Sequence, residues 1–146
     1  KYFNVANNLE MQYDPENNLS WWTYDELDRV SVEKDVFGKA TTFTYEVDGM
    51  IDTITDRLGR VITNSYDDKN QLITQTWKNS AGGSVIGTLA YTYNDVGQVL
   101  TASNAAGTYT FTYDAEGRLK TQTDIYGIVL DFEYNDAGDR TSLSDS

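Results

Sequence analysis

The stretch TYTFTYDAEGRLKTQT, residues 108–123, consists of two alternating segments separated by a short connection. In its first half the aromatic residues Tyr109, Phe111 and Tyr113 occupy every second position, with threonines between them. A period of two places alternate side chains on opposite faces of a β-strand. The connection DAEG opens with an acid and closes with a glycine, which is typical of a tight turn. The stretch therefore predicts a β-hairpin with one aromatic and one polar face.

The same pattern recurs along the chain. A tyrosine followed by an acidic or amide residue occurs in steps of 21, 21, 27, 20 and 21 residues, at Tyr24, Tyr45, Tyr66, Tyr93, Tyr113 and Tyr134. The glycines of these Tyr-led copies are Gly49, Gly97, Gly117 and Gly138. Halfway between them, a second marker of Asp or Asn, two variable residues and glycine ends at Gly38, Gly59, Gly107 and Gly127. A constant period of this length is typical of a repeat architecture.

Each marker has a physical role in a turn. The side chain of Asp or Asn can bond the backbone two residues on, and glycine adopts the positive φ that closes the turn. Two Tyr-led copies lack the glycine and carry Asp28 or Asn70 in its place. These residue types tolerate left-handed geometry best after glycine. We therefore expect hairpin loops of three to five residues at both markers.

The repeat predicts the fold class. Each unit of about 21 residues is one hairpin of two short strands, so the chain is expected to be an all-β antiparallel meander of about a dozen short strands. Because neighbouring strands rotate by roughly 20–25°, such a meander should coil as part of a larger spiral sheet or shell. We assign residues 24–146 to one continuous array and residues 1–23 to an irregular amino-terminal repeat or cap region. Since the chain begins at Lys1 and not at Met, we expect a fragment or a processed product of a longer array.

Composition argues against several function classes. The 23 Asp and Glu residues outnumber the 11 Lys and Arg residues, and the net charge of -12 repels phosphate backbones and anionic lipids. The chain has no His and no Cys, which removes imidazole and thiol catalysis and every Cys/His zinc site. The loops around Asp67 and Asp124 supply too few oxygens for calcium. We expect no catalytic, metal or cofactor site, no nucleic-acid or membrane partner, and no enzyme.

The motif Tyr-Asp-x-x-Gly-Arg-Leu at this spacing resembles the Rhs/YD-repeat family, and YDAEGRL at Tyr113–Leu119 matches it fully. The resemblance covers roughly Tyr24 to the carboxy terminus. It implies a hairpin sheet that spirals into a hollow shell, as in bacterial polymorphic toxins, insecticidal toxin complexes and teneurins. In the toxins the shell encloses a toxic segment. The resemblance thus implies a structural segment of a secreted or cell-surface protein, with neighbouring repeats as its partners. The Asp-Pro-containing motif that closes the toxin shells is absent here, because the only proline is Pro15.

The aromatic residues leave a second function open. They make up 13% of the chain, and aromatic faces stack on sugars as they do on other apolar groups. The alternative is therefore an extracellular module that binds carbohydrate or protein. The alternation of tyrosine with phenylalanine favours packing in a buried ladder over sugar binding. Trp21 and Trp22, in what reads as an irregular connection, and Trp77 are the candidate contact residues.

Two further features concern partners. The six extra residues between Tyr66 and Tyr93 fall in KNSAGGSVIG, from Lys78 to Gly87. A long loop on a rigid scaffold often carries function, but surface insertions are also tolerated cheaply, and we favour a neutral insertion. Open strand edges also predict self-association of the fragment.

Overall fold

A computed structural model describes residues 1–145, which form fourteen β-strands and no helix. The strands are β1 (Tyr2–Phe3), β2 (Leu9–Tyr13), β3 (Leu19–Tyr24), β4 (Val30–Lys34), β5 (Ala40–Tyr45), β6 (Ile51–Thr55), β7 (Val61–Tyr66), β8 (Leu72–Lys78), β9 (Val85–Tyr93), β10 (Val99–Asn104), β11 (Gly107–Tyr113), β12 (Leu119–Thr123), β13 (Val129–Tyr134) and β14 (Arg140–Asp145). In the described part of the chain, no helix is long and apolar enough to span a membrane.

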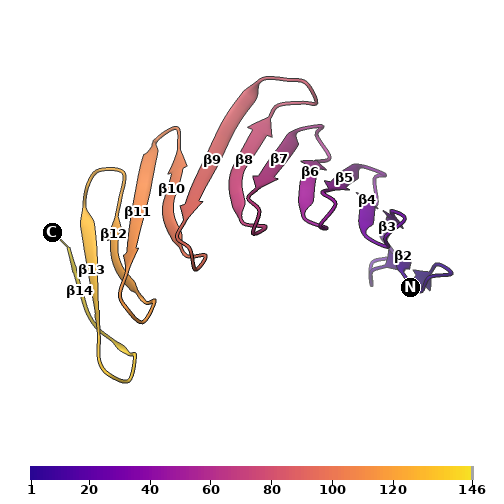
Figure 1. The fold of residues 1–146 in the computed structure, drawn as a ribbon. Helices are drawn as coiled ribbons and strands as arrows, with labels where there is room; N and C mark the ends of the chain where they lie inside the picture. The colour runs from indigo at the N-terminus through magenta and orange to yellow at the C-terminus, as the bar shows by residue number, and fades with distance from the viewer. Residues whose placement is uncertain (146) are drawn as a thin grey trace. The chain divides into compact units, whose positions relative to one another are not determined.

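The strands follow one another in the sheet in the order in which they occur in the chain (Figure 1). Strand pairs are antiparallel, as in β2–β3, β6–β7 and β12–β13. The predicted all-β antiparallel meander is therefore confirmed. The chain forms two compact units, one of Lys1–Ser65 with Thr76–Ile86 and one of Tyr66–Gln75 with the residues from Gly87 onward.

The turns have one geometry at both markers. In the turn Asp35–Gly38, the Gly38 N–H donates to the Asp35 carbonyl (2.8 Å) and the Asp35 N–H to the Lys39 carbonyl (3.1 Å). The Asp35 side chain also accepts the N–H groups of Phe37 and Lys39, both at 2.9 Å. These bonds satisfy the backbone inside a tight loop. The predicted role of the opening acid is confirmed.

Left-handed residues close the turns as expected. Asp28 and Asn70 have φ values of 59° and 61°, so both stand where glycine stands in other copies. Asn7 and Asn17 do the same at 66° and 67°, which extends the turn geometry into the first 23 residues. The φ values of the predicted glycines lie between 71° and 91°, except at Gly107.

The marker NAAG departs from the prediction. Asn104 and Gly107 pair with each other as the last residue of β10 and the first of β11, so the loop contains only residues 105 and 106. The φ of Gly107 is 153°, far from that of the other turn glycines. A Cβ on Gly107 would lie 2.8 Å from the Cβ of Ile125, so close packing, and not turn closure, accounts for this glycine.

Two other expectations need correction. Trp21 and Trp22 do not occupy an irregular connection, because both lie in β3, paired with Lys34 and Glu33 of β4. The tyrosine before them, Tyr13, precedes a half-period turn, which is why the spacing there is halved. The insertion is also not a ten-residue loop, since only residues 79–84 connect the two strands and the rest lengthens β8 and β9.

A change of register follows five of the Tyr-led turns. In β11–β12, Thr112 lies opposite Thr121 and Tyr113 opposite Leu119, so one strand carries an extra residue. The same shift occurs in β3–β4, β5–β6, β9–β10 and β13–β14. Such a β-bulge reverses the alternation of faces. It therefore lets an aliphatic residue and the threonine two positions later face opposite sides.

The sheet is a single layer. Threonine hydroxyls pair across strands on one face, for example Thr112 with Thr121 at 2.7 Å and Thr44 with Thr53 at 2.6 Å. The other face carries apolar rows such as Phe43–Ile54–Ile62. Among residues 1–145 no hydrophobic side chain is fully buried, so the expected buried ladder is only half-buried. No second layer of these residues covers it.

Candidate functional site

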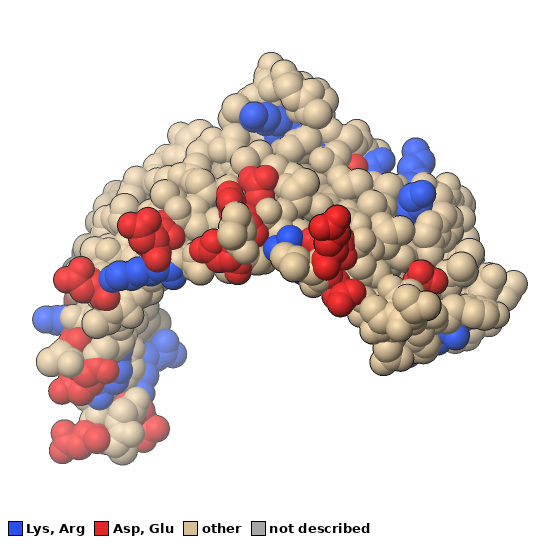
Figure 2. Space-filling model, turned by 45° about the vertical axis from the view of Figure 1, so that its right-hand side comes forward, with Lys and Arg blue, Asp and Glu red and all other residues tan. Residues whose placement is uncertain are grey.

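The turns fall into two sets, because alternate turns of a meander lie at opposite ends of the strands. The YD turns are Asn4–Asn7, Asp25–Asp28, Glu46–Gly49, Asp67–Asn70, Asn94–Gly97, Asp114–Gly117 and Asn135–Gly138. The half-period turns are Asp14–Asn17, Asp35–Gly38, Asp56–Gly59 and Asp124–Gly127. Acidic side chains gather toward the margin of the YD turns (Figure 2).

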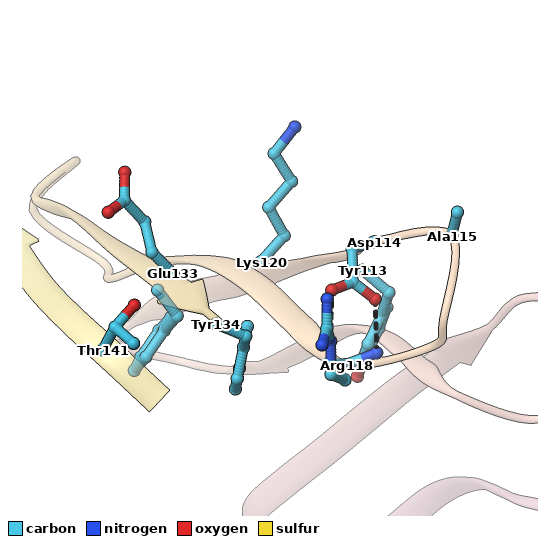
Figure 3. A pocket seen from close by; sticks show the side chains of 9 residues that line it. Tyr113, Asp114, Ala115, Arg118, Lys120, Glu133, Tyr134 and Thr141 are labelled. Carbon is cyan, nitrogen blue, oxygen red and sulfur yellow. Dashed lines mark hydrogen bonds and ion pairs between the residues drawn. The ribbon is translucent and has the colours of Figure 1, made fainter. Parts of the chain in front are cut away.

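The turn Asp114–Gly117 shows what the full motif does. The Asp114 side chain accepts the N–H groups of Glu116 (3.1 Å) and Arg118 (2.8 Å), which fixes the loop. Its second carboxylate oxygen binds Nε of Arg118 at 2.6 Å, as the dashed line in Figure 3 marks. One acid thus shapes its own turn and holds the arginine beside it.

The arginine then reaches the next repeat. Arg118 lies 4.7 Å from the ring centroid of Tyr134 and donates to the Asn135 carbonyl (3.4 Å), which opens the next YD turn. In Figure 3 the Arg118 and Tyr134 side chains lie on the same side of the strands, whereas Lys120 and Glu133 point away. Arg29 repeats the arrangement, at 4.4 Å from the Tyr45 ring and 3.3 Å from the Glu46 carbonyl. A guanidinium over an aromatic face is attracted electrostatically.

Other residue types make the same connection where arginine is absent. Gln98 donates to the Gly117 carbonyl of the next YD turn at 2.6 Å. Asn8 donates to the Asp28 side chain at 2.7 Å, and Lys69 to the Asp95 carbonyl at 3.0 Å. At these steps the contact between successive turns is therefore retained although the donor changes.

The tyrosines of the motif form a second set of links. Their hydroxyls donate to backbone carbonyls of the preceding unit at distances of 2.7 to 2.9 Å. The pairs are Tyr24 with Leu9, Tyr45 with Val30, Tyr93 with Leu72, Tyr113 with Val99, and Tyr134 with Leu119. In each pair the acceptor is the first residue of the strand after the preceding YD turn. Each tyrosine thus ties the last residue of its strand to the first residue of the strand before it, which belongs to the preceding YD hairpin.

Burial and charge shift several pKa values in these turns. The backbone hydrogen bond from Arg29 lowers the pKa of Asp25. Burial raises the pKa of Asp114, but hydrogen bonds from the side chain and backbone of Arg118 outweigh it and leave that pKa below the usual value. Burial, and then the charge of Asp25, raise the pKa of Tyr45. The carboxylates therefore stay ionised and the tyrosine stays a donor at neutral pH.

The predicted contact tryptophans lie apart from these links. Trp21 contacts Lys34, whose Nζ lies 5.6 Å from the centroid of the indole. Trp22 is its neighbour in β3 and faces the other side of the sheet. Trp77, at the end of β8, lines a small cavity at the insertion. All three are half-buried.

Some of the residues involved were not predicted from the sequence. Asn64 is the one buried polar residue among residues 1–145, and its amide donates to the Ile51 carbonyl at 2.9 Å. Its place two residues before Tyr66 is the only signal in the sequence. The donors Asn8 and Gln98 were also missed, because they differ in type from the arginine of the full motif.

The charged residues beside the turn Asp114–Gly117 bind one another and so hold the turn in place. A depression of 560 Å³ lies beside the turn Asp114–Gly117 and is lined in part by Arg118, Phe132 and Tyr134 (Figure 3). Its arginine is already bound to Asp114 and Glu116. Within residues 1–145 no group of three or more acids is placed to hold a metal ion.

The amino-acid sequence matches those of known proteins over most of the chain. Residues 23–146 match the family described as Teneurin YD-shell. Over 106 residues the chain is 34% identical to double-stranded DNA deaminase toxin A of Burkholderia cenocepacia (strain H111), which covers 73% of this chain and 7% of that protein.

Solved structures share the fold. The Tc holotoxin pore of Photorhabdus luminescens matches with a TM-score of 0.85 at 16% identity, over 99% of this chain and 9% of that one. The crystal structure of TcdB2-TccC3 without its hypervariable C-terminal region matches with a TM-score of 0.86 at 18% identity, again over 99% and 9%. The chain thus spans less than a tenth of the length of these relatives.

Proposed function

Because this chain belongs to the teneurin YD-shell family, we propose that it is a wall segment of a hollow shell that encloses a toxic segment of its own polypeptide. The chain itself is a structural repeat segment, and its partners are neighbouring repeats. The enclosed segment is proposed by likeness to the deaminase toxin and the Tc toxin structures.

One observation carries the proposal: the sheet is one layer thick and its hairpins are joined by side-chain bonds. A domain that stands alone buries a hydrophobic core, but no hydrophobic residue among residues 1–145 is fully buried. The tyrosine and arginine links repeat from one hairpin to the next, so further hairpins can be added without new chemistry. A wall requires this property and a globular domain does not.

Three narrower statements belong to the same proposal. The segment has no catalytic role, since its turn acids serve in turn and inter-turn bonds, as Asp114 does. The parent protein acts outside the cell that makes it, by likeness to the toxins of the family. Binding of glycans is not proposed, because five of the six motif tyrosines direct their hydroxyls into the sheet.

The test is limited proteolysis of the complete polypeptide that contains these residues. A closed wall should protect an enclosed segment from the protease. A double Tyr113→Phe and Tyr134→Phe substitution removes two links of the wall and should speed cleavage of the enclosed segment. Electron microscopy of the unaltered protein should show a hollow body with internal density.

The matched control is Tyr109→Phe together with Tyr126→Phe. Tyr109 and Tyr126 are 37% and 83% exposed, and neither hydroxyl bonds another residue in the described part of the chain. The control should leave the cleavage rate unchanged. Uniform cleavage of the unaltered protein, with no protected segment, would contradict the proposal.

A further inference from the structure

The strand β14 is last in the order of the sheet and lies in the second compact unit (Figure 1). It pairs with β13 on one side, and no strand of residues 1–145 pairs with its other side. Leu143, which lies opposite Phe132, is 54% exposed in this edge strand. An edge strand presents backbone groups that another strand can pair with.

β14 stands in the array where β12 stands one repeat earlier. Tyr113 lies opposite Leu119 in the pair β11–β12, and the same shift of register accompanies both this contact and its counterpart in β13–β14. That counterpart is Tyr134, which lies opposite Arg140. The far side of β12 is occupied by β13, the first strand of the next hairpin. The open side of β14 therefore corresponds to the side of β12 that pairs with β13.

The outward backbone groups of β14 follow from that correspondence. The Asp124 N–H donates to the Ile128 carbonyl across the half-period turn at 2.9 Å. The alternation of an antiparallel ladder therefore directs the N–H and C=O of Gln122 toward β13 as well. Leu143 occupies in β14 the place that Gln122 occupies in β12, because each lies opposite the phenylalanine of the preceding strand. The N–H and C=O of Leu143 thus point to the open side.

The carbonyl of Arg140 lies where a tyrosine hydroxyl bonds in other repeats. The five hydroxyl bonds of the motif tyrosines end on the first residue of the strand after a YD turn, for example Tyr134 on Leu119. Arg140 is the first residue of β14, and none of those five bonds reaches it. A following hairpin with the Tyr-led motif would bring a hydroxyl to this carbonyl.

The residue after each YD turn faces the next YD turn, and at Asp139 its chemistry is reversed. Four earlier copies carry a donor there that bonds the following turn at 2.6 to 3.4 Å, and they are Asn8, Arg29, Gln98 and Arg118. Asp139 is exposed, and among residues 1–145 its carboxylate receives only a 3.4 Å contact from the Asn135 amide. A carboxylate only accepts hydrogen bonds, so it cannot bond the turn carbonyls that Gln98 and Arg118 reach.

The last residue of the next turn lies against this position. Asn8 bonds the side chain of Asp28, the last residue of the following YD turn, at 2.7 Å. Gln98 bonds the carbonyl of Gly117, also the last residue of its turn, at 2.6 Å. The pair of Asn8 and Asp28 thus joins an amide after one turn to a carboxylate at the end of the next. Asp139 offers the carboxylate first, so the complementary group is an amide at the end of the next turn.

We propose that the open edge of β14 binds a following Tyr-led hairpin of the parent polypeptide whose YD turn ends in asparagine. Its first strand pairs with β14 through Leu143, its tyrosine donates to the Arg140 carbonyl, and its asparagine amide donates to the Asp139 carboxylate. Asparagine suits this place because Asn7 and Asn70 close YD turns with φ values of 66° and 61°. The inference rests on the proposed wall, and it makes Asp139 the residue that determines which hairpin follows.

The strands of a second copy fit this edge less well. In the sheet order of the described residues, only β1 and β14 have an open side. β1 has two residues, and the residue before its YD turn is Phe3, which has no hydroxyl for the Arg140 carbonyl. An antiparallel pair of β14 strands would bring the end that carries Asp139 toward the end that carries Asp145, where like charges repel. The occupant is therefore a hairpin outside residues 1–145.

The test extends the chain by one hairpin. Because Asp145 occupies the place of Asp124, a copy of residues 125–145 is joined directly after Asp145, in place of the last residue. The copy is made in two forms, one that keeps the glycine closing its YD turn and one with asparagine there. Hydrogen exchange followed by NMR measures the protection of the Leu143 amide. Both forms should protect this amide relative to the unextended chain, and the asparagine form should protect it about fivefold more.

Substitutions of Asp139 test the selectivity. Asp139→Ala removes the acceptor and should abolish the difference between the two forms. Asp139→Arg restores a donor of the Arg118 type, so the glycine form should then be protected at least as well as the asparagine form. The matched control is Gly138→Asn in the unextended chain, where the new asparagine faces Arg118. This control should give no gain in the protection of the Gln122 amide.

The proposal is overturned if the two forms protect Leu143 equally while Asp139 is present, or if the advantage of asparagine survives Asp139→Ala. It is also overturned if concentrating the unextended chain protects the Leu143 amide, which would identify a second copy as the occupant. Failure of both forms to protect Leu143 would contradict the proposed wall as well, whereas equal protection contradicts only the choice of asparagine.

Discussion

The YD turns and the half-period turns have the same backbone geometry but different surroundings. The Gly117 N–H donates to the Asp114 carbonyl at 3.0 Å, and the Gly127 N–H to the Asp124 carbonyl at 3.1 Å. Yet only the first turn carries an arginine that reaches the next turn on its side. The half-period turn instead exposes Tyr126, which is 83% accessible. Closing a hairpin and joining it to its neighbour are thus separate tasks for separate residues.

The register of the strands differs in the same way. After a half-period turn the pairing continues evenly, as at Thr123↔Val129, whereas after a YD turn it shifts by one residue. A bulge increases the local twist. The YD side therefore holds both the links between hairpins and the feature that bends the strands.

Charge follows the same division. The YD turns with the residue after each contain twelve acids, namely Asp25, Glu26, Asp28, Glu46, Asp48, Asp67, Asp68, Asp95, Asp114, Glu116, Asp136 and Asp139. Their bases are only Arg29, Lys69 and Arg118. The half-period turns with the residue after each contain five acids, balanced in part by the three bases Lys39, Arg57 and Arg60. Most of the net negative charge therefore lies on the side that bears the links.

The largest expected effect tests whether the two turns are equal. Gly138→Val in a YD turn and Gly127→Val in a half-period turn each force a β-branched residue to a φ of 86°, with no other atom within 4 Å of the new Cβ, which should lower the free energy of unfolding by about 2 kcal/mol. Asn in place of Val at the same two glycines should lower the free energy of unfolding by clearly less, because Asn70 already has a positive φ at the equivalent turn position. Urea unfolding measures all four variants. Unequal costs for the two valine variants would show that the turns are not equivalent.

The next effect separates the two sides. Tyr134→Phe removes the hydroxyl bond to the Leu119 carbonyl, at an expected cost of about 1 kcal/mol. Tyr126→Phe on the half-period side should cost nothing measurable. Chemical unfolding of both variants gives the comparison, and equal stabilities would remove the tyrosine links from the account.

Acid should weaken the YD side through Asp114. Its folded-state pKa lies below the unfolded value, so its contribution is complete above that value and is lost as the pH falls through the folded pKa. Asp114→Asn keeps an acceptor for the turn, as Asn94 does naturally, but cannot titrate. Stability of the unaltered chain should therefore fall more steeply than that of the variant from about pH 5 to pH 2. Parallel curves by urea unfolding would contradict this.

The smallest effect concerns the crowded acids. Raising the salt concentration from about 0.01 M to 0.15 M shortens the screening length and relieves repulsion among YD-turn acids. The melting temperature should rise slightly, by less than the change caused by Tyr134→Phe. Neutralising Asp68 and Asp95 with Asn should reduce this salt response, whereas a fall in melting temperature with salt would reverse the argument.

The sequence was sufficient for the turns and the strand alternation, because both depend on neighbours in the chain. Asp28 and Asn70 could be recognised as replacements for glycine from their position alone. The marker NAAG misled, since the letters that open and close a longer turn also fit a two-residue loop when β10 and β11 pair to their ends. Only the close approach of Gly107 to Ile125 in the folded chain distinguishes the two-residue loop from the longer turn.

The hydrogen bonds that link one turn or strand to the next could not be predicted from the sequence. The hydroxyl of Tyr134 meets a carbonyl fifteen residues earlier, and any residue can supply a carbonyl. The donors between turns range from arginine to Gln98 and Asn8, so no shared letter marks them. The β-bulge that places the aliphatic residue and the threonine on opposite faces of the sheet is also not marked by any one residue type.

The central claim is that one wall is built from interchangeable hairpins, and deletion of residues 114–134 tests it most directly. The deletion joins Tyr113 to Asn135, so the next YD turn follows in register and Tyr113 keeps its acceptor Val99. Deletion of residues 114–123 is the control. It removes β12 alone, so β13 reverses its direction and Tyr134 moves to the end of the strands where the half-period turns lie. Circular dichroism and hydrogen exchange should show a folded β-sheet after the first deletion and a lost carboxy-terminal hairpin after the second. Collapse to coil after the first deletion would contradict the account.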